Sequence, residues 1–207
     1  MHKTLTSPRR RTLLAAAGAA ALTSPLSVLA QSGEDIVIGG SIPLTGVFAF
    51  AGVGINAGIG DYVKMVNDAG GIKGRKLKYV PEDTGYKVDV SVAAYKKITS
   101  QNKVHLYYGD STGFSKTINP ELDRAGTTLM AGASFASELN DPAKYPNQFL
   151  VGPDYTEMFG ILVKHIAKEK PGAKVAFVYS DSEFGRDPIE KSEAEAKKLG
   201  LSVPVKI

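Results

Sequence analysis

The sequence has no cysteine among its 207 residues. This absence excludes a disulfide framework and any cysteine-ligated metal site. Histidine is scarce as well, with His2, His105 and His165 at no spacing that would let them share a metal ion, so we interpret the last two as core or surface residues. Residues 109–113, Gly-Asp-Ser-Thr-Gly, have the Gly-x-Ser-x-Gly spacing of a serine nucleophile, but the sequence shows no base to activate Ser111. We therefore expect neither an enzyme nor a cofactor site.

An excess of positive charge is lacking too, once the first 30 residues are set aside. The chain has 25 lysines and arginines, of which four lie in residues 1–30, so 21 bases remain to match its 21 acids. A protein that binds nucleic acid usually carries a basic surface. The balance therefore gives no support for a nucleic-acid partner.

Residues 1–30 are typical of an export signal peptide. Lys3 and Arg9–Arg11 form a basic head, residues 13–22 an apolar centre, and Val28-Leu29-Ala30 a small-residue cleavage site. The apolar centre is shorter than the ~20 residues that span a bilayer. Residues 10–14 also resemble the twin-arginine export pattern, which leaves the export route open. We predict an exported, periplasmic protein.

After the leader, a unit of strand, loop and helix begins at Ile36 and is repeated along the chain. Ile36–Ile38 is a β-branched run that ends at Gly39-Gly40 and predicts a parallel strand buried on both faces. A loop with Ser41, Phe48 and Phe50 follows, and an apolar stripe then predicts a helix over 55–66. Further strands are expected at 76–80, 104–108, 128–131, 148–152, 175–179 and 201–207, and further helices at 89–102, 114–125, 155–168 and 189–199.

This alternation predicts an α/β fold, a three-layer sandwich with a parallel sheet. Parallel strands joined by right-handed crossovers place the loops that follow them at one edge of the sheet. Pro120 is expected to kink or restart its helix, and Asp187-Pro188 to cap the start of the last helix. We interpret Asp181, Glu183 and Asp187 together as a solvated acidic loop. The polar stretch 140–147 marks a lobe boundary near residue 150.

Two motifs in order resemble those of a known family. Residues 40–46, Gly-Ser-Ile-Pro-Leu-Thr-Gly, are followed by Gly52 and then by Asn67-Asp68-Ala69-Gly70-Gly71-Ile72-Lys73-Gly74. Together they are similar to the leucine/isoleucine/valine-binding family of type I periplasmic binding proteins, the solute receptors of ABC importers. The resemblance extends over essentially all of the chain after the leader.

The resemblance implies a two-lobed protein that closes by a hinge over a small solute and is recognised by a membrane permease. Members of this family are about twice as long. We therefore expect residues 31–150 to form the first lobe and residues 151–207 the beginning of a second, truncated lobe.

The resemblance also implies a ligand site. The ligand carboxylate would be held by Ser111, Thr112 and Gly113 after one strand and by Ala133, Ser134 and Phe135 after the next. Free N–H groups at a helix amino end suit a carboxylate. Phe184 would close over the ligand, and Phe50 and Tyr155 would form walls. The alternatives are that Ser111 or Thr112 only caps its helix and that Phe184 serves hinge or core packing.

Two positions depart from the branched-chain binders. Ala51 stands where they carry a tyrosine, and Phe135 where they carry a threonine. Both changes remove hydroxyls and make the site more apolar or aromatic. The expected ligand therefore need not be a branched-chain amino acid.

Parts of the sequence are also compatible with two alternative functions. Gly52–Gly58 is loosely similar to a dinucleotide fingerprint, with Glu82 or Asp83 as the ribose partner, which would indicate an exported nucleotide-dependent enzyme. Against this, the loop 41–51 separates these glycines from the first strand. The third interpretation is a ligand-sensing domain on the same fold.

Overall fold

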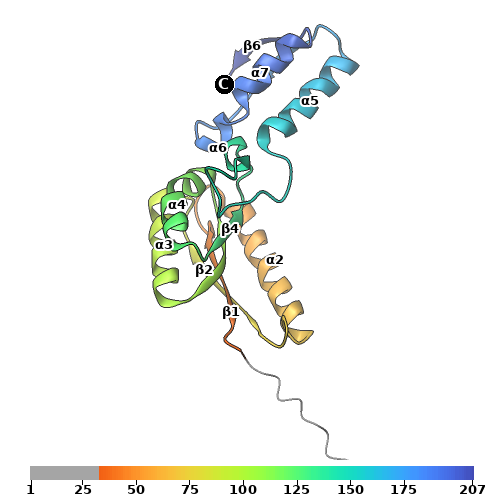
Figure 1. Ribbon diagram of the computed structural model, residues 1–207. Coiled ribbons are helices and arrows are strands. Elements are labelled where there is room, and N and C mark those ends of the chain that lie inside the picture. The colour runs from red at the N-terminus through yellow and green to blue at the C-terminus, as the bar shows by residue number, and fades with distance from the viewer. Residues whose placement is uncertain (1–32) are drawn as a thin grey trace, which may run out of the picture. The chain divides into compact units, whose positions relative to one another are not determined.

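A computed structural model describes residues 33–207, so the predicted signal peptide lies outside the described residues (Figure 1). The first sheet has the strands β1 (Ile36–Ile42), β2 (Leu77–Asp83), β3 (Val104–Gly109) and β4 (Leu129–Gly132). All pair in parallel, in the order β2-β1-β3-β4, with Ile38 of β1 opposite Tyr79 of β2 and Leu106 of β3. The predicted α/β class with a parallel sheet is confirmed.

The strand order reverses between β1 and β3. Successive strands are added on one side of β1 as β2 and on the other side as β3 and β4. In sheets of this kind the loops at the carboxyl ends of the strands open a crevice where the order reverses, and ligands bind there. The topology therefore directs attention to the loops that follow β1 and β3.

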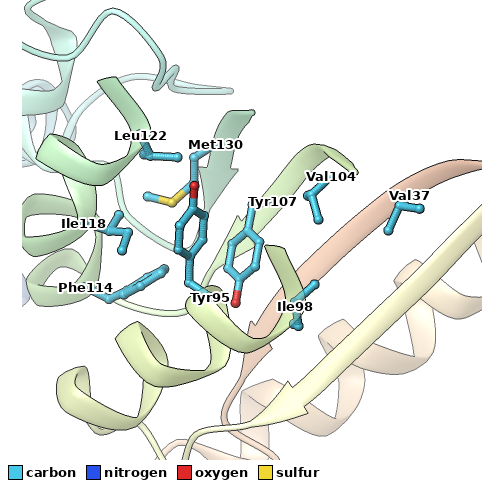
Figure 2. Packing of buried hydrophobic residues seen from close by; sticks show 9 residues of the cluster. All are labelled: Val37, Tyr95, Ile98, Val104, Tyr107, Phe114, Ile118, Leu122 and Met130. Atoms are coloured by element: carbon cyan, nitrogen blue, oxygen red, sulfur yellow. The ribbon is translucent and has the colours of Figure 1, made fainter. Parts of the chain in front are cut away.

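Helices cover both faces of this sheet (Figure 1). The helix α2 (Ala49–Asp68) lies on one face, and α3 (Val88–Gln101) and α4 (Thr112–Ala125) lie on the other. A cluster of buried side chains fills the space between the sheet and α3 and α4 (Figure 2). Its centre is Tyr107, which packs edge-on against Tyr95 with ring centroids 4.9 Å apart.

The α2 face is less well filled. A cavity of about 440 Å³ separates α2 from β1, β3 and β4 and has an apolar lining that includes Ile59, Tyr62 and Leu106. The start of α2, by contrast, is tightly placed. A side chain added at Gly52 would lie 2.0 Å from the carbonyl oxygen of Pro43, so only glycine allows the helix to pass so close to the preceding loop.

A second sheet is formed by β5 (Lys174–Phe177) and β6 (Ser202–Lys206), which are parallel. The helices α5 (Tyr155–Glu169), α6 (Glu183–Arg186) and α7 (Ile189–Lys198) belong to the same segment. Val163, Phe177, Ile189, Ala196 and Leu201 form its buried cluster. A capping box fixes the start of α5, because Asp154 accepts a hydrogen bond from the Glu157 N–H and Glu157 accepts one from the Asp154 N–H.

Several predicted elements differ from the structure. The strand predicted at 148–152 is wrong: Gln148 makes only an isolated bridge to Met130. The helix α4 runs through Pro120 without restarting. The strand β1 does not end at Gly39 but continues to Ile42, paired with β2 throughout, and Gly39 leaves room for the Tyr107 ring, which would lie 2.7 Å from an added Cβ.

In the described part of the chain, from residue 33 onward, no helix is both long and apolar enough to cross a membrane. The division of the chain into lobes at residue 150 stays a prediction.

Candidate functional site

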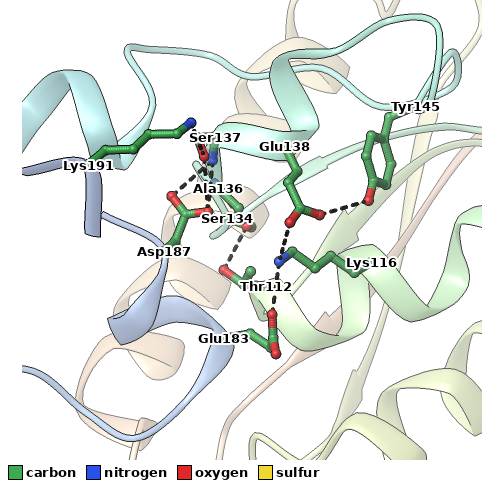
Figure 3. Close-up of polar contacts among 10 residues, drawn as sticks. All are labelled: Thr112, Lys116, Ser134, Ala136, Ser137, Glu138, Tyr145, Glu183, Asp187 and Lys191. Carbon is green, nitrogen blue, oxygen red and sulfur yellow. Dashed lines mark hydrogen bonds and ion pairs between the residues drawn. The ribbon is translucent and has the colours of Figure 1, made fainter. Parts of the chain in front are cut away.

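The loops that follow β3 and β4 meet through two hydroxyl groups (Figure 3). The Oγ1 of Thr112 lies 2.8 Å from the Oγ of Ser134, and both residues are buried. The backbones at the strand ends approach closely, because a Cβ added at Gly132 would lie 2.1 Å from the carbonyl oxygen of Gly109. The structure thus brings together the two loops that the sequence placed at one edge of the sheet.

Ser111 is the N-cap of α4. Its Oγ accepts a hydrogen bond of 3.2 Å from the N–H of Phe114, so the capping role weighed for this residue is present in the structure. Thr112 and Gly113 are the first residues of α4, whose first-turn N–H groups have no partners within the helix. A role of these three residues in ligand binding stays a prediction.

Tyr155, at the start of α5, joins this group. Its hydroxyl donates to the carbonyl oxygen of Ala133 at 3.0 Å, and its N–H donates to the carbonyl oxygen of Phe135 at 2.8 Å. Its ring packs edge-on against Phe135 and Phe184, with centroids 6.0 and 5.1 Å apart. Burial raises the pKa of the Tyr155 hydroxyl, which therefore stays protonated. Beside Tyr155 and Phe184 lies a cavity of about 110 Å³.

Phe50 lies in a second aromatic group. It is 82 % exposed in the first turn of α2 and stacks on Phe48, with centroids 5.8 Å apart. Phe48 in turn packs against Tyr86, with centroids 3.9 Å apart. Tyr86 is not among the site residues predicted from the sequence. The local signal for it is weak: a loop position three residues after the end of β2 and next to a glycine.

Asp83 ties the loops after β1 and β2 to each other. Its carboxylate accepts hydrogen bonds from the N–H groups of Leu44, Thr45 and Gly85 and from the Thr45 hydroxyl, at 2.8–3.1 Å. Burial opposes ionisation, but the bond from Gly85 and those from Thr45 and Leu44 outweigh it and lower the pKa of Asp83. The carboxylate therefore binds four donors of the protein's own loops.

This arrangement contradicts the nucleotide interpretation. Asp83 is not free to hold a ribose, and Glu82 pairs with Lys97 at 2.7 Å. The glycines at 52–58 lie inside α2 and form no phosphate-binding loop.

Lys116 of α4 bridges two acids from other segments (Figure 3). Its Nζ lies 2.8 Å from Glu183 of α6 and 3.4 Å from Glu138, which lies in the short 3₁₀ helix η1 (Ser137–Asn140). The hydrogen bond and the charge of Lys116 lower the pKa of Glu183. Burial opposes protonation of Lys116, but the bond to Glu183 and the charges of both acids raise its pKa. The Lys116–Glu183 ion pair joins two residues that are 67 positions apart in the sequence.

Asp187 makes a second such connection. Its carboxylate accepts from the Ser137 N–H at 3.0 Å and from the Ser137 hydroxyl at 3.3 Å. The prediction that Asp187 caps the last helix is wrong, since Pro188 holds the N-cap position without a side-chain bond. Glu183 is exposed, as the prediction of a solvated acidic loop requires, although it pairs with Lys116, whereas Asp187 is partly buried and does not fit that prediction. Asp181 is exposed and forms an ion pair with Arg186.

Asp110 is a buried carboxylate behind these loops. It is 2 % exposed and accepts hydrogen bonds from the hydroxyls of Thr84 and Ser91, the latter at 2.9 Å. It directly precedes Ser111 and so connects the loop after β2 with the start of α4. Among residues 33–207, no group of three or more acidic or histidine side chains is placed to hold a metal ion.

The model of the family described as periplasmic binding protein matches residues 35–207 of the chain. The chain therefore belongs to the periplasmic binding protein family, and its fold is that of the type I members.

Named relatives agree with this assignment. The chain is 26 % identical to the Leu/Ile/Val-binding protein homolog 7 of Brucella suis over 186 residues, which are 86 % of this chain and 46 % of the relative. It is 25 % identical to an amino acid binding protein of Pseudomonas aeruginosa, covering 88 % of this chain and 49 % of that protein. The chain thus spans about half the length of the curated relatives it matches. These relatives are named as binding proteins.

Among solved structures, the chain resembles that of a branched chain amino acid ABC transporter from Thermus thermophilus with bound valine. The TM-score is 0.78 at 28 % identity, covering 85 % of this chain and 46 % of the other. A fatty acid ABC transporter substrate-binding protein from Thermomonospora curvata has a TM-score of 0.75 at 22 % identity, with 84 % and 44 % covered. The second likeness concerns the fold alone.

Proposed function

We propose that this chain is the extracytoplasmic solute-binding component of an ABC importer and that it binds an amino acid or a similar small carboxylate or amide. The observation that carries the proposal is the contact between Thr112 and Ser134 at the amino end of α4, next to Tyr155. The relatives named as amino-acid-binding proteins support it.

The two hydroxyls are suited to hold an anionic or polar oxygen. Their mutual hydrogen bond uses one hydroxyl hydrogen, and the Ser134 oxygen also accepts from the Ala136 N–H at 3.3 Å. The second hydroxyl hydrogen has the Tyr155 oxygen within reach, and a ligand oxygen would replace that acceptor. The first-turn N–H groups of α4 and the positive end of the helix dipole favour the same negative group. A carboxylate is thus accommodated without a buried lysine or arginine.

Hinge closure is the proposed mechanism, and no bond is made or broken. The solute binds the loops after β3 and β4, and α6 then closes over it with Phe184 next to Tyr155. A ligand that binds the closed form more tightly shifts the population towards it. A membrane permease would recognise that closed form, and the signal peptide at residues 1–30 would bring the protein to the periplasm.

The test is identification of the ligand. Small molecules released from the purified chain are identified by mass spectrometry, and a thermal-shift screen covers amino acids, their amides and aromatic acids. We expect at least one carboxylate or amide to raise the melting temperature and to bind in calorimetry. If no compound in these classes binds, the proposal is wrong.

A further inference from the structure

Tyr86 has a backbone conformation that is unfavourable for its side chain. Its φ is +64°, in the left-handed region, and it follows Gly85 at +55°. A bulky side chain at such an angle costs free energy that glycine would not. Strained residues of this kind persist where the surrounding structure holds them, and they gather at ligand sites. Position 86 therefore carries an aromatic side chain in a backbone conformation that favours glycine.

The ring of Tyr86 faces Phe48 from the neighbouring loop. Their centroids are 3.9 Å apart at an interplanar angle of 30°. Next to Phe48, Val47 and Phe50 are 78 % and 82 % exposed. The loops after β1 and β2 thus present an apolar, aromatic edge beside the point where the strand order reverses, which is where open α/β sheets bind ligands.

The strained turn is anchored to the proposed ligand site. The Tyr86 N–H donates to the Thr84 Oγ1 at 3.3 Å, and the Thr84 hydroxyl donates to Asp110. Asp110 directly precedes Ser111, the N-cap of α4. Burial, together with Tyr155 and Asp110, raises the pKa of Tyr86 to about 12. Its phenol is thus neutral at physiological pH.

We infer that Tyr86, packed on Phe48, is a specificity-determining residue of the proposed site and selects a carboxylate ligand that carries a flat ring over one with a branched aliphatic side chain. This rests on the proposed function. A flat ring gains from packing edge-on or offset against other aromatic rings, beyond the area that it buries. The aromatic groups of this segment are Phe48 with Tyr86, in the loops after β1 and β2, and Phe135 with Tyr155 and Phe184, in the loop after β4 and at the starts of α5 and α6.

The test is calorimetry on the full chain with two pairs of probes that share the carboxylate, L-phenylalanine with L-leucine and phenylacetate with 3-methylbutanoate. We expect the aromatic member of at least one pair to bind about tenfold or more tightly than its aliphatic partner, since one stacked ring contributes about 1.4 kcal/mol.

Tyr86→Gly is the decisive variant, because glycine adopts the left-handed backbone without strain. We expect it to raise or hold the melting temperature and to abolish the preference for the aromatic probe, whereas Tyr86→Phe should retain the preference. Tyr62→Ala, which removes an exposed ring on α2, is the matched control and should leave the preference unchanged.

The outcomes separate the two proposals. If the aliphatic probes bind as tightly as the aromatic ones, or the preference survives in Tyr86→Gly, the inference is wrong while the proposed function stands. The same holds if none of the four probes binds while another compound of the screen does. If none of the four probes nor any compound of the wider screen binds, the proposed function fails, and this inference fails with it.

Discussion

The hydroxyl of Thr112 lies 2.8 Å from that of Ser134, although the two residues are 22 positions apart and belong to loops after different strands. The pair is buried, so the loss of either hydroxyl removes a hydrogen bond that water cannot replace. A substitution at either position therefore affects both loops.

Thr112→Val tests the hydroxyl pair. Valine has nearly the shape of threonine but leaves Ser134 without its partner, and a lost hydrogen bond of this kind costs about 1 kcal/mol. We expect a five- to tenfold weaker affinity for the tightest ligand of the screen, measured by calorimetry. Ser100→Ala removes an exposed hydroxyl at the end of α3 and serves as the control. Unchanged affinity in Thr112→Val would place the ligand elsewhere.

Replacing two glycines of α2 by alanine should change the free energy of unfolding in opposite directions. Gly52→Ala places a Cβ 2.0 Å from the Pro43 carbonyl oxygen and should lower the free energy of unfolding by about 2 kcal/mol. At Gly54 nothing lies within 4 Å of an added Cβ, so Gly54→Ala should raise the free energy of unfolding by about 0.5–1 kcal/mol. Urea unfolding measures both. A stabilising Gly52→Ala would contradict the close contact between α2 and Pro43.

The contribution of the Lys116–Glu183 pair to stability should depend on pH. The pKa of Glu183 is lowered from its ordinary 4.5, so its contribution is complete above 4.5 and is lost as pH falls through the lowered pKa. The pKa of Lys116 is raised from 10.5, so its contribution is complete below 10.5 and is lost as pH rises through the raised pKa. Lys116→Gln should therefore cost a constant amount, below about 1 kcal/mol, between pH 5 and 10.

Below pH 4.5 the difference in unfolding free energy between the wild type and Lys116→Gln should shrink. Lys96→Gln is the control, because its ammonium pairs with Glu121 at 3.4 Å in a more exposed position. Urea unfolding of all three proteins from pH 3 to pH 9 measures the effect. A cost that does not change across this range would show that the pair adds nothing through its charge.

Asp83→Ala should loosen the loops after β1 and β2. It removes an acceptor shared by Leu44, Thr45 and Gly85, and we expect a loss of about 1–2 kcal/mol. Because the pKa of Asp83 lies below its ordinary 3.8, this contribution is present above pH 3.8 and disappears as pH falls further. Hydrogen exchange at residues 44–46 measures the loosening. Glu82→Ala, at an exposed ion pair, should leave that exchange unchanged.

The repeated strand, loop and helix could be predicted because the sequence marks them locally. The apolar run at 36–38 and the glycines at 70 and 71 depend on neighbours in the chain, and the structure contains the corresponding strand and helix. Gly39 was misjudged for the opposite reason. Its role depends on the ring of Tyr107, which is distant in sequence and which only the folded sheet places beside it.

The candidate site, too, has residues that could be predicted from the sequence and residues that could not. Thr112 and Ser134 could be predicted to lie together because each follows a strand of one parallel sheet. Asp187 could not be assigned correctly, because its partner Ser137 lies 50 positions away while the adjacent proline is typical of a helix cap. Tyr86 was missed because neither its left-handed backbone nor its contact with Phe48 follows from local sequence.

The hydrogen bonds of Asp83 hold the stretches 43–46 and 84–87 in a fixed position relative to each other. An engineer who wishes to retarget this scaffold must transplant both stretches with their aspartate. Grafting one alone would leave the donors of residues 44, 45 and 85 without a matching acceptor, and the new loop would lose its shape before it met any new solute.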